Sequence, residues 1–203
     1  MRPPKKTGLY FGTFNPVHIG HLNIANYMVA FSDLDEVWMV VTPHNPHKKK
    51  KTLLEDHHRL GMVRMALEDY PKIRASNVEF YLAQPNYTIN TLLHLEEKHP
   101  GHQFSLIMGG DNLRNLHKWK NADVLVKNYP IYVYPRIPGT IENTTGTPPV
   151  LTFEGSQNIQ KIEAPIMQLS STFIRRAIKE GKDIRPMLPE AVWRYVDEMH
   201  FYR

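Results

Sequence analysis

Short apolar runs alternate with longer amphipathic segments along the chain. The apolar runs have the length of strands and lie at residues 7–11, 37–41, 104–108, 129–134 and 162–166. The amphipathic segments have helical spacing and lie at residues 19–31, 54–70, 88–99, 171–180 and 189–199. Uninterrupted apolar runs are typical of buried strands, and strands that alternate with helices indicate βαβ units. The pattern predicts a Rossmann-like α/β fold, with a mainly parallel sheet and helices on both faces. We expect one domain over residues 1–203, with a small helical portion from about residue 170.

The first predicted strand leads into a turn rich in special residues. Residues 12–21 read Gly-Thr-Phe-Asn-Pro-Val-His-Ile-Gly-His. Ligands of such sheets bind at the carboxyl ends of the strands, where the amide groups of a helix N-terminus can face a phosphate chain. His18 and His21 are three residues apart, so they share one face of the first helical turn. Imidazole N–H groups held there could stabilise charge on the α-phosphoryl oxygens of a nucleotide.

Two other interpretations of these histidines are open from the residues alone. They could be ordinary surface residues, or they could bind a metal together with the four histidines at positions 44, 47, 57 and 58. The chain has no cysteine and no helical His-Glu-x-x-His pattern, which argues against a structural zinc site.

A second polar segment, residues 170–176, stands before a predicted helix and reads Ser-Ser-Thr-Phe-Ile-Arg-Arg. Ser170 or Ser171 could cap this helix, and Arg175 would lie one turn further on. A hydroxyl group, open helix N–H groups and a guanidinium together can bind a polyphosphate. The alternative is an ordinary cap followed by solvated arginines.

Both segments resemble signatures of the HxGH nucleotidyltransferase superfamily. The first is similar to its Gly-x-Phe-x-Pro-x-His-x-Gly-His string and the second to its Ser-Ser/Thr-Thr-x-Ile-Arg string. The resemblance implies that the two histidines contact the phosphates of ATP, and that the second segment grips the β- and γ-phosphates. It implies the catalytic residues His18, His21 and Arg175. The implied ATP-binding residues are Gly12, Thr13, Phe14, His18, His21, Gly109, Asp111, Ser171, Thr172 and Arg175.

Over nearly its full length the chain resembles the bacterial nicotinate-nucleotide adenylyltransferase family. The likeness is carried by residues 42–48, 86–92, 107–113 and 116–120. It implies that Lys48 binds the phosphate of the acceptor, that Thr88 helps to hold the nicotinate carboxylate, and that Trp119 stacks on the pyridine ring. The full set of implied acceptor-binding residues is Asn45, Lys48, Tyr87, Thr88, Trp119 and Arg136. The chain departs from the family pattern at Phe11, Asn90 and Gly110, none of which is a phosphate-binding group.

The implied reaction transfers AMP from ATP to nicotinate mononucleotide and gives deamido-NAD and pyrophosphate, a step of NAD biosynthesis. Mg²⁺ would bind to the polyphosphate of ATP, without a dedicated metal site on the protein. Within the superfamily, nicotinamide mononucleotide or phosphopantetheine are alternative acceptors. If the protein is not an enzyme, the alternative is a nucleotide-binding or RNA-binding module.

Composition and net charge indicate which partners and which cellular compartment to expect. The net charge of +5 favours anionic partners, and the motifs favour small phosphorylated molecules over nucleic acid. No apolar run approaches the roughly 20 residues of a membrane span, so we expect no membrane association. The absence of cysteine suits a reducing cytoplasm, where we expect the protein, with a homo-oligomer as a possibility. We expect lysines 49–51 to be solvated and residues 137–149 to form a loop.

Overall fold

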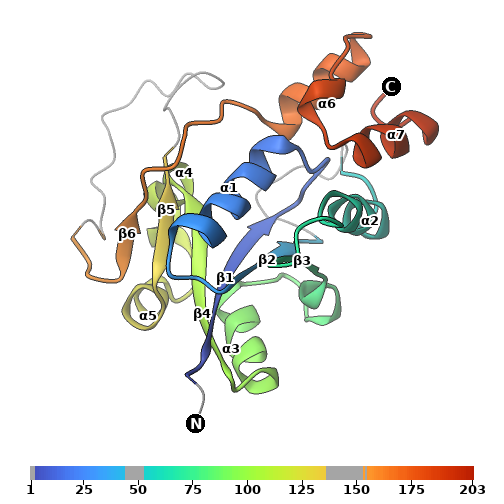
Figure 1. Ribbon diagram of the computed structural model, residues 1–203. Helices are drawn as coiled ribbons and strands as arrows, with labels where there is room; N and C mark the ends of the chain where they lie inside the picture. The colour runs from blue at the N-terminus through green and yellow to red at the C-terminus, as the bar shows by residue number, and fades with distance from the viewer. Residues whose placement is uncertain (1–2, 44–52, 136–152, 154) are drawn as a thin grey trace.

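The computed structural model describes residues 3–43, 53–135, 153 and 155–203. Its six strands form one parallel sheet in the order β3-β2-β1-β4-β5-β6 (Figure 1). The strands are β1 (Lys5–Gly12), β2 (Glu36–Val41), β3 (Ile73–Ser76), β4 (His102–Gly109), β5 (Ile131–Tyr134) and β6 (Ile159–Lys161). The order 3-2-1-4-5-6 is the doubly wound arrangement, so the Rossmann-like prediction is confirmed.

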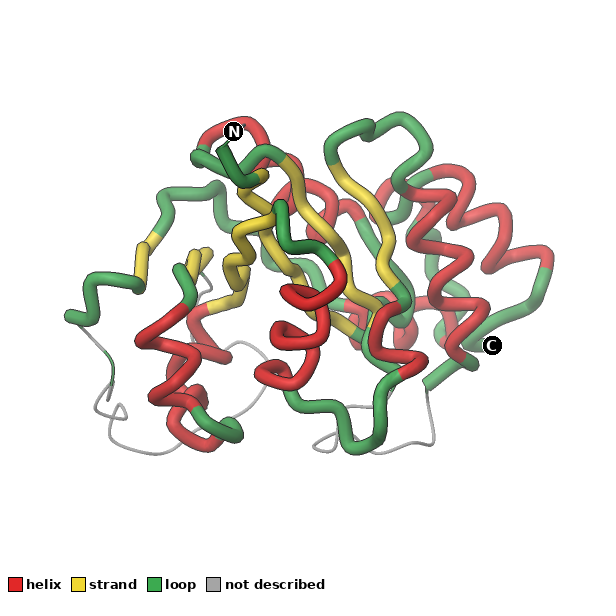
Figure 2. The backbone as a smooth tube through the Cα atoms, turned by 90° about the horizontal axis from the view of Figure 1, so that it is seen from below, coloured by secondary structure: helices red, strands yellow, loops and turns green. Residues whose placement is uncertain are grey.

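Helices cover both faces of the sheet (Figure 2). The helices are α1 (Ile19–Phe31), α2 (Asp56–Ala66), α3 (Thr88–Lys98), α4 (Gly110–Asn115), α5 (Ala122–Asn128), α6 (Ser171–Lys179) and α7 (Glu190–Glu198). The 3₁₀ turns are η2 (Val78–Tyr81), η3 (Leu116–Lys118) and η4 (Arg185–Met187). Of these elements, α1, α2, α6 and α7 pack on one face, while α3, α4 and α5 pack on the other.

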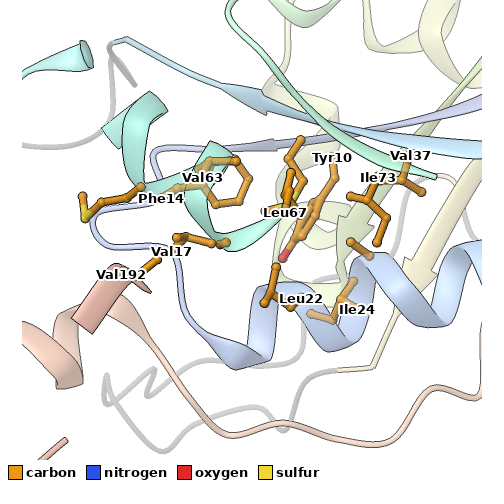
Figure 3. Close-up of a cluster of buried hydrophobic side chains, with 14 of the residues drawn as sticks. Tyr10, Phe14, Val17, Leu22, Ile24, Val37, Val63, Leu67, Ile73 and Val192 are labelled. Atoms are coloured by element: carbon orange, nitrogen blue, oxygen red, sulfur yellow. The ribbon is translucent and has the colours of Figure 1, made fainter. Parts of the chain in front are cut away.

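Successive strand residues divide between two cores. In β1, Tyr10 belongs to the core under α1 and α2, and its neighbour Leu9 belongs to the core under α3. The same alternation separates Met39 from Val40 in β2. Figure 3 shows Tyr10 between side chains of α1 and α2 in the first of these cores. Because both faces are buried, the central strands are apolar at most positions, which is why they appear as apolar runs.

Most of the predicted elements are confirmed. The helix predicted over residues 19–31 has those bounds, whereas the one predicted over 54–70 is shorter, at Asp56–Ala66. The prediction of a strand over residues 162–166 is wrong, because β6 lies earlier and the chain after it is irregular. The N–H of Ile162 still donates to Val133 O at 3.0 Å, and Pro165 then offers no N–H for further pairing. The sequence patterns also missed β3, α4 and α5, which are too short to show a clear periodicity.

The strand order reverses between β1 and β4. In doubly wound sheets a crevice opens at the carboxyl ends of the strands at this point. Gly12 ends β1 there and Gly109 ends β4. Figure 1 shows α6 and α7 beyond the carboxyl end of β1, so the end of the chain returns to the crevice. Among the described helices, none combines the length and apolar character that a membrane span requires.

Candidate active site

The turn between β1 and α1 is shaped by one glycine and one buried aromatic ring. A Cβ on Gly12 would lie 2.8 Å from the Phe14 ring, so only glycine leaves room for that ring. Phe14 adopts a φ of 46°, which is uncommon for an aromatic residue, and its side chain is buried. The ring meets the His21 imidazole edge to face at 5.0 Å. Phe14 therefore supports His21, and its backbone is the part that can face a nucleotide.

The two histidines form a stacked pair at the start of α1. Their ring centroids are 3.7 Å apart and their planes differ by 23°. His18 is the N-cap residue, and its backbone N–H donates to Nδ1 of His21 at 3.2 Å. A Cβ on Gly20 would lie 3.0 Å from Nδ1 of His18, so glycine at this position lets the His18 ring lie over the helix start. The expectation that the two rings share one face is confirmed.

The stacked rings lie against a small hollow, and the His18 side chain is 3% exposed. Its opposite walls come from the sheet and from the irregular chain that precedes α6. These walls include Tyr10, Tyr134, Pro135, Ala164, Pro165, Met167 and Leu169. The hollow therefore combines polar imidazole edges and two tyrosines with a mainly apolar wall.

The second signature contacts the first directly. Ser170 caps α6, because its Oγ accepts from the N–H of Phe173 at 3.2 Å. Ser171 Oγ donates to Pro16 O at 2.9 Å, and Arg175 Nη1 donates to Asn15 O at 2.7 Å. Two segments about 150 residues apart in the sequence are thus in direct contact.

Arg175 is also held within its own helix. Its Nη2 donates to Thr172 Oγ1 at 3.2 Å. Burial lowers the pKa of this guanidinium, and the nearby Tyr202 acts in the opposite direction. An arginine starts from so high a value that it stays charged at neutral pH. The site therefore contains a fixed positive charge beside the β1–α1 turn.

A buried arginine that the sequence reasoning missed connects two loops of the crevice. Arg59 of α2 has no exposed surface. Its guanidinium uses all five N–H donors, four of them on backbone carbonyls. The acceptors are Leu54 O at 2.9 Å, Thr13 O at 2.7 Å, Thr42 O at 2.9 Å, Pro43 O at 3.3 Å and the carboxylate of Asp56. The only sequence signal was its spacing, since Arg59 stands on the same helix face as the buried Met62, Val63 and Ala66.

Gly109 and Asp111 lie at the carboxyl end of β4, beside β1. A Cβ on Gly109 would lie 2.5 Å from Oδ1 of Asp111 and 3.1 Å from the Tyr134 ring. Asp111 is in the first turn of α4, and Tyr134 lines the hollow. Asp111 therefore lies close to the end of β4, where only glycine at position 109 leaves room for its carboxylate and for the Tyr134 ring.

The predicted acceptor residues that the structure describes gather at the start of α3. Tyr87 is the N-cap residue of α3 and Thr88 is its first residue. Trp119 follows η3 and packs with Tyr87 against the same hydrophobic core. The Lys120 ammonium lies 4.5 Å from the centroid of the Tyr87 ring, so an aromatic and cationic corner forms there. Asn45, Lys48 and Arg136 lie outside the described residues, and so do lysines 49–51 and residues 137–149.

A buried carboxyl group beneath this corner was not predicted. Glu79 in η2 is 2% exposed, and its Oε1 accepts from Thr91 Oγ1 at 2.9 Å. Asn86 Nδ2 donates to the backbone oxygen of Glu79 at 2.9 Å, which ties the start of α3 to η2. Burial raises the pKa of Glu79, while hydrogen bonds from Thr91 and Thr42 oppose the rise. A single acid in a sequence without an obvious partner gives no signal of such a role.

Within the described ranges, no three His, Asp or Glu side chains converge as metal ligands do. The prediction that the protein has no metal cage of its own stays a prediction.

The doubly wound sheet places the paired imidazoles at its switch point, and Arg175 of α6 contacts the same turn, which is the arrangement expected of a nucleotidyltransferase. A family model described as cytidylyltransferase-like matches residues 9–177. Two relatives share the name "Probable nicotinate-nucleotide adenylyltransferase". The protein of Christiangramia forsetii is 56% identical over 98% of this chain and 99% of its own length. That of Flavobacterium johnsoniae is 58% identical over 98% and 99%. The chain therefore belongs to the cytidylyltransferase-like family and, within it, to the nicotinate-nucleotide adenylyltransferases.

The fold has a counterpart among solved structures. A Plasmodium falciparum nicotinic acid mononucleotide adenylyltransferase, complexed with NaAD, superposes with a TM-score of 0.76. The superposition covers 98% of this chain and 97% of that protein, at 18% sequence identity. At this identity the likeness concerns the fold, and it agrees with the family membership that the relatives establish.

Proposed function

We propose that this protein transfers the adenylyl group of ATP to nicotinate mononucleotide, giving deamido-NAD and pyrophosphate. One observation carries the proposal: the stacked His18 and His21 rings at the switch point share their turn with Arg175. The names of the relatives point to the same reaction.

The chemistry is an in-line displacement. A phosphate oxygen of nicotinate mononucleotide forms a new bond to the α-phosphorus of ATP. The bond between that phosphorus and the oxygen bridging to the β-phosphorus breaks, and its electron pair leaves with pyrophosphate. No covalent bond to the protein forms, so the protein contributes positioning and charge stabilisation.

The backbone assigns the proton of His21. Because Nδ1 accepts the N–H of His18, the proton of a neutral ring is on Nε2. With a proton on Nδ1, the His18 N–H and the His21 Nδ1–H would both be donors and could not form a hydrogen bond with each other. Two charged rings would also repel at 3.7 Å. In this proposal Nε2–H of His21 donates to a phosphoryl oxygen as negative charge develops there. The His18 imidazole, stacked on the His21 ring, helps to stabilise the same charge.

The polyphosphate is bound by the second signature. Arg175 supplies the charge and Thr172 a hydroxyl group, while the open N–H groups of α6 point the same way. Ser171 donates to Pro16 O and therefore holds α6 against the turn. Asp111, at the end of β4, would accept hydrogen bonds from the ribose hydroxyls.

The acceptor lies at the start of α3 in this proposal. Thr88 and the helix N-terminus would hold the nicotinate carboxylate, since negative charge is favoured there. Trp119 would stack on the pyridine ring, beside Tyr87. Asn45, Lys48 and Arg136 are proposed as further contacts of the acceptor on the family resemblance.

Mg²⁺ is the proposed metal, bound to the polyphosphate of ATP. Asp111 is a carboxylate near the hollow, and Mg²⁺ typically combines one or two carboxylates with phosphate oxygens and water. When bound, the ion neutralises charge on the leaving pyrophosphate.

An acceptor panel tests the reaction. Initial rates of pyrophosphate release from ATP and Mg²⁺ are compared with nicotinate mononucleotide, nicotinamide mononucleotide and phosphopantetheine, and the products are identified by mass. We expect the highest rate and deamido-NAD with the first. A higher rate with either of the others would transfer the assignment to that acceptor. Binding of ATP without pyrophosphate release from any acceptor would favour a non-catalytic module.

The role of the imidazoles is tested by His18→Ala. Loss of a preorganised donor to a developing charge lowers kcat by about 10²–10³. We expect kcat to fall by this factor, whereas the melting temperature should change much less in proportion. A variant with wild-type turnover would refute the catalytic role of His18.

A further inference from the structure

The last residues of the sequence turn back onto the catalytic turn. After α7 the chain reverses through His200 and Tyr202, whose φ values of 54° and 67° are in the left-handed region. Such values are uncommon outside glycine, so the surrounding packing has to hold them. Phe201 packs on the His58 ring at 4.8 Å between centroids. The reversal directs the Tyr202 side chain toward the site.

The Tyr202 hydroxyl group ends on the first signature. It donates to Asn15 Oδ1 at 2.7 Å, although 187 residues separate the two in the sequence. The same Oδ1 accepts the backbone N–H of Leu54 at 3.3 Å, and Asn15 is 3% exposed. Burial raises the pKa of Tyr202 well above its usual value, although the charges of Arg175 and Arg59 act to lower it. The hydroxyl group therefore keeps its proton and can act as the donor.

Asn15 is bound at both its side chain and its backbone. Its backbone oxygen accepts Nη1 of Arg175 at 2.7 Å, while its carboxamide oxygen accepts Tyr202. A change in the side-chain contact therefore alters the peptide group on which the guanidinium rests.

We propose that Tyr202 is a positioning residue of the active site, which acts through Asn15 to set the direction of the Arg175 guanidinium toward the ATP polyphosphate. It does not touch the substrate in this proposal. The inference rests on the role of Arg175 in the proposed function, but nothing in the family signatures assigns a part to Tyr202.

Tyr202→Phe removes the hydroxyl group and keeps the ring. We expect kcat/KM for ATP to fall about tenfold, because misplacement of a binding group by a fraction of an ångström weakens its contacts in the transition state. KM for the acceptor should change less than KM for ATP, since Arg175 contacts only the nucleotide.

Tyr195→Phe is a matched control. Tyr195 is on α7, and its hydroxyl group forms one hydrogen bond of 2.8 Å with Nδ1 of His58, away from the turn. Both variants lose one tyrosine hydrogen bond of the same segment. We expect similar shifts of the melting temperature from both variants, and wild-type kinetics from Tyr195→Phe. Assays run well below the lower melting temperature keep both variants folded.

A double-variant cycle separates positioning from general support. Binding of α,β-methylene ATP is measured for the wild type, Tyr202→Phe, Arg175→Ala and the double variant. If Tyr202 acts through Arg175, Tyr202→Phe weakens binding in the wild type and has little effect once Arg175 is gone. An equal loss in both backgrounds, or no loss in the wild type, would overturn the proposal. This measurement needs no acceptor, so it stays informative even if the acceptor assignment fails.

Discussion

At the scale of single residues, the arrangement of the stacked His18 and His21 rings depends on their own backbone and on glycines that leave room for side chains. The His18 N–H selects the tautomer of His21, and Gly20 clears the space for the His18 ring. Gly12 and Gly109 do the same for Phe14 and Asp111. Each of these glycines is at a position where a single methyl group would meet a side chain of the site.

Gly20→Ala should therefore affect activity and stability in opposite directions. The new methyl group would displace the His18 ring by a few tenths of an ångström, and we expect turnover to fall roughly tenfold. Alanine is the better helix former by about 1 kcal/mol, so the free energy of unfolding should stay equal or rise. Turnover and urea unfolding are measured together.

Gly61→Ala is the control for this effect. Gly61 lies within α2, and a Cβ there would meet no heavy atom within 4 Å. We expect the same gain in helix stability and unchanged turnover. An active Gly20→Ala enzyme would show that the His18 ring tolerates the methyl group.

Glu79 gives a prediction about pH. Burial raises its pKa in the folded protein, so the folded state holds this proton more tightly than the unfolded chain. Its contribution to stability is therefore complete below the unfolded value of about 4.3 and declines as the pH rises through the folded value. We expect Glu79→Gln to unfold at a higher temperature than the wild type at pH 8, with the difference shrinking toward pH 4.

Glu97→Gln on α3 is the control, because it removes the same charge from an exposed position. Its melting temperature relative to the wild type should change little between these pH values. A Glu79→Gln variant that parallels this control at every pH would contradict the effect of burial.

At the scale of elements, short loops at the strand ends are fixed by side chains from distant helices. Arg59 of α2 joins the turn after β1 to the chain after β2, and Arg175 of α6 joins the same turn from the other end of the sequence. The hydrophobic patterns gave the helices but could not say where their polar side chains would reach.

Arg59→Lys should destabilise the protein strongly. Lysine has three donors in place of five, so at least two of the buried acceptors would lose their partner. Each buried group left unpaired costs about 1–3 kcal/mol, and we expect a loss of at least about 2 kcal/mol in urea unfolding.

Arg194→Lys on α7 is the matched control, since Arg194 is an exposed arginine that pairs with Glu190. Exposed pairs contribute little, and we expect no clear change. Equal stability of the two variants would mean that the network around Arg59 does not hold the loops.

At the scale of the whole molecule, the site exists because the sheet reverses its order between β1 and β4, and because the end of the chain folds back over that point. A nucleotide bound there would contact segments from both ends of the sequence. Its binding energy should therefore appear in the stability of the whole fold.

A non-hydrolysable ATP analogue at about 100 times its Kd should stabilise the folded state by about 2.7 kcal/mol. For a chain of this length that corresponds to an increase of roughly 5–10 °C in the melting temperature. Hydrogen exchange should slow in residues 12–21 and 170–176 together. Slower exchange in only one of these segments would mean that the two signatures do not share the ligand.

Local sequence patterns are sufficient to predict the order of the main elements, the fold class and the two signature segments. Buried strands and amphipathic helices have periodic patterns that are visible locally, and the histidine and serine-arginine strings are contiguous. The edge strand β3 was not predicted, and β6 was predicted a few residues too late in the sequence. Both are defined by pairing with a neighbouring strand, which local patterns do not show.

Which polar side chains meet depends on how the helices and the sheet pack in three dimensions. Glu79 and Tyr202 carry no local pattern that distinguishes them from ordinary polar residues, and the spacing of Arg59 on the buried face of α2 does not reveal its partners. Their roles come from burial and from partners up to 187 residues away, such as Thr91 for Glu79 and Asn15 for Tyr202. Hydrogen bonds of this kind are fixed by how the layers pack, and local periodicity holds no information about them.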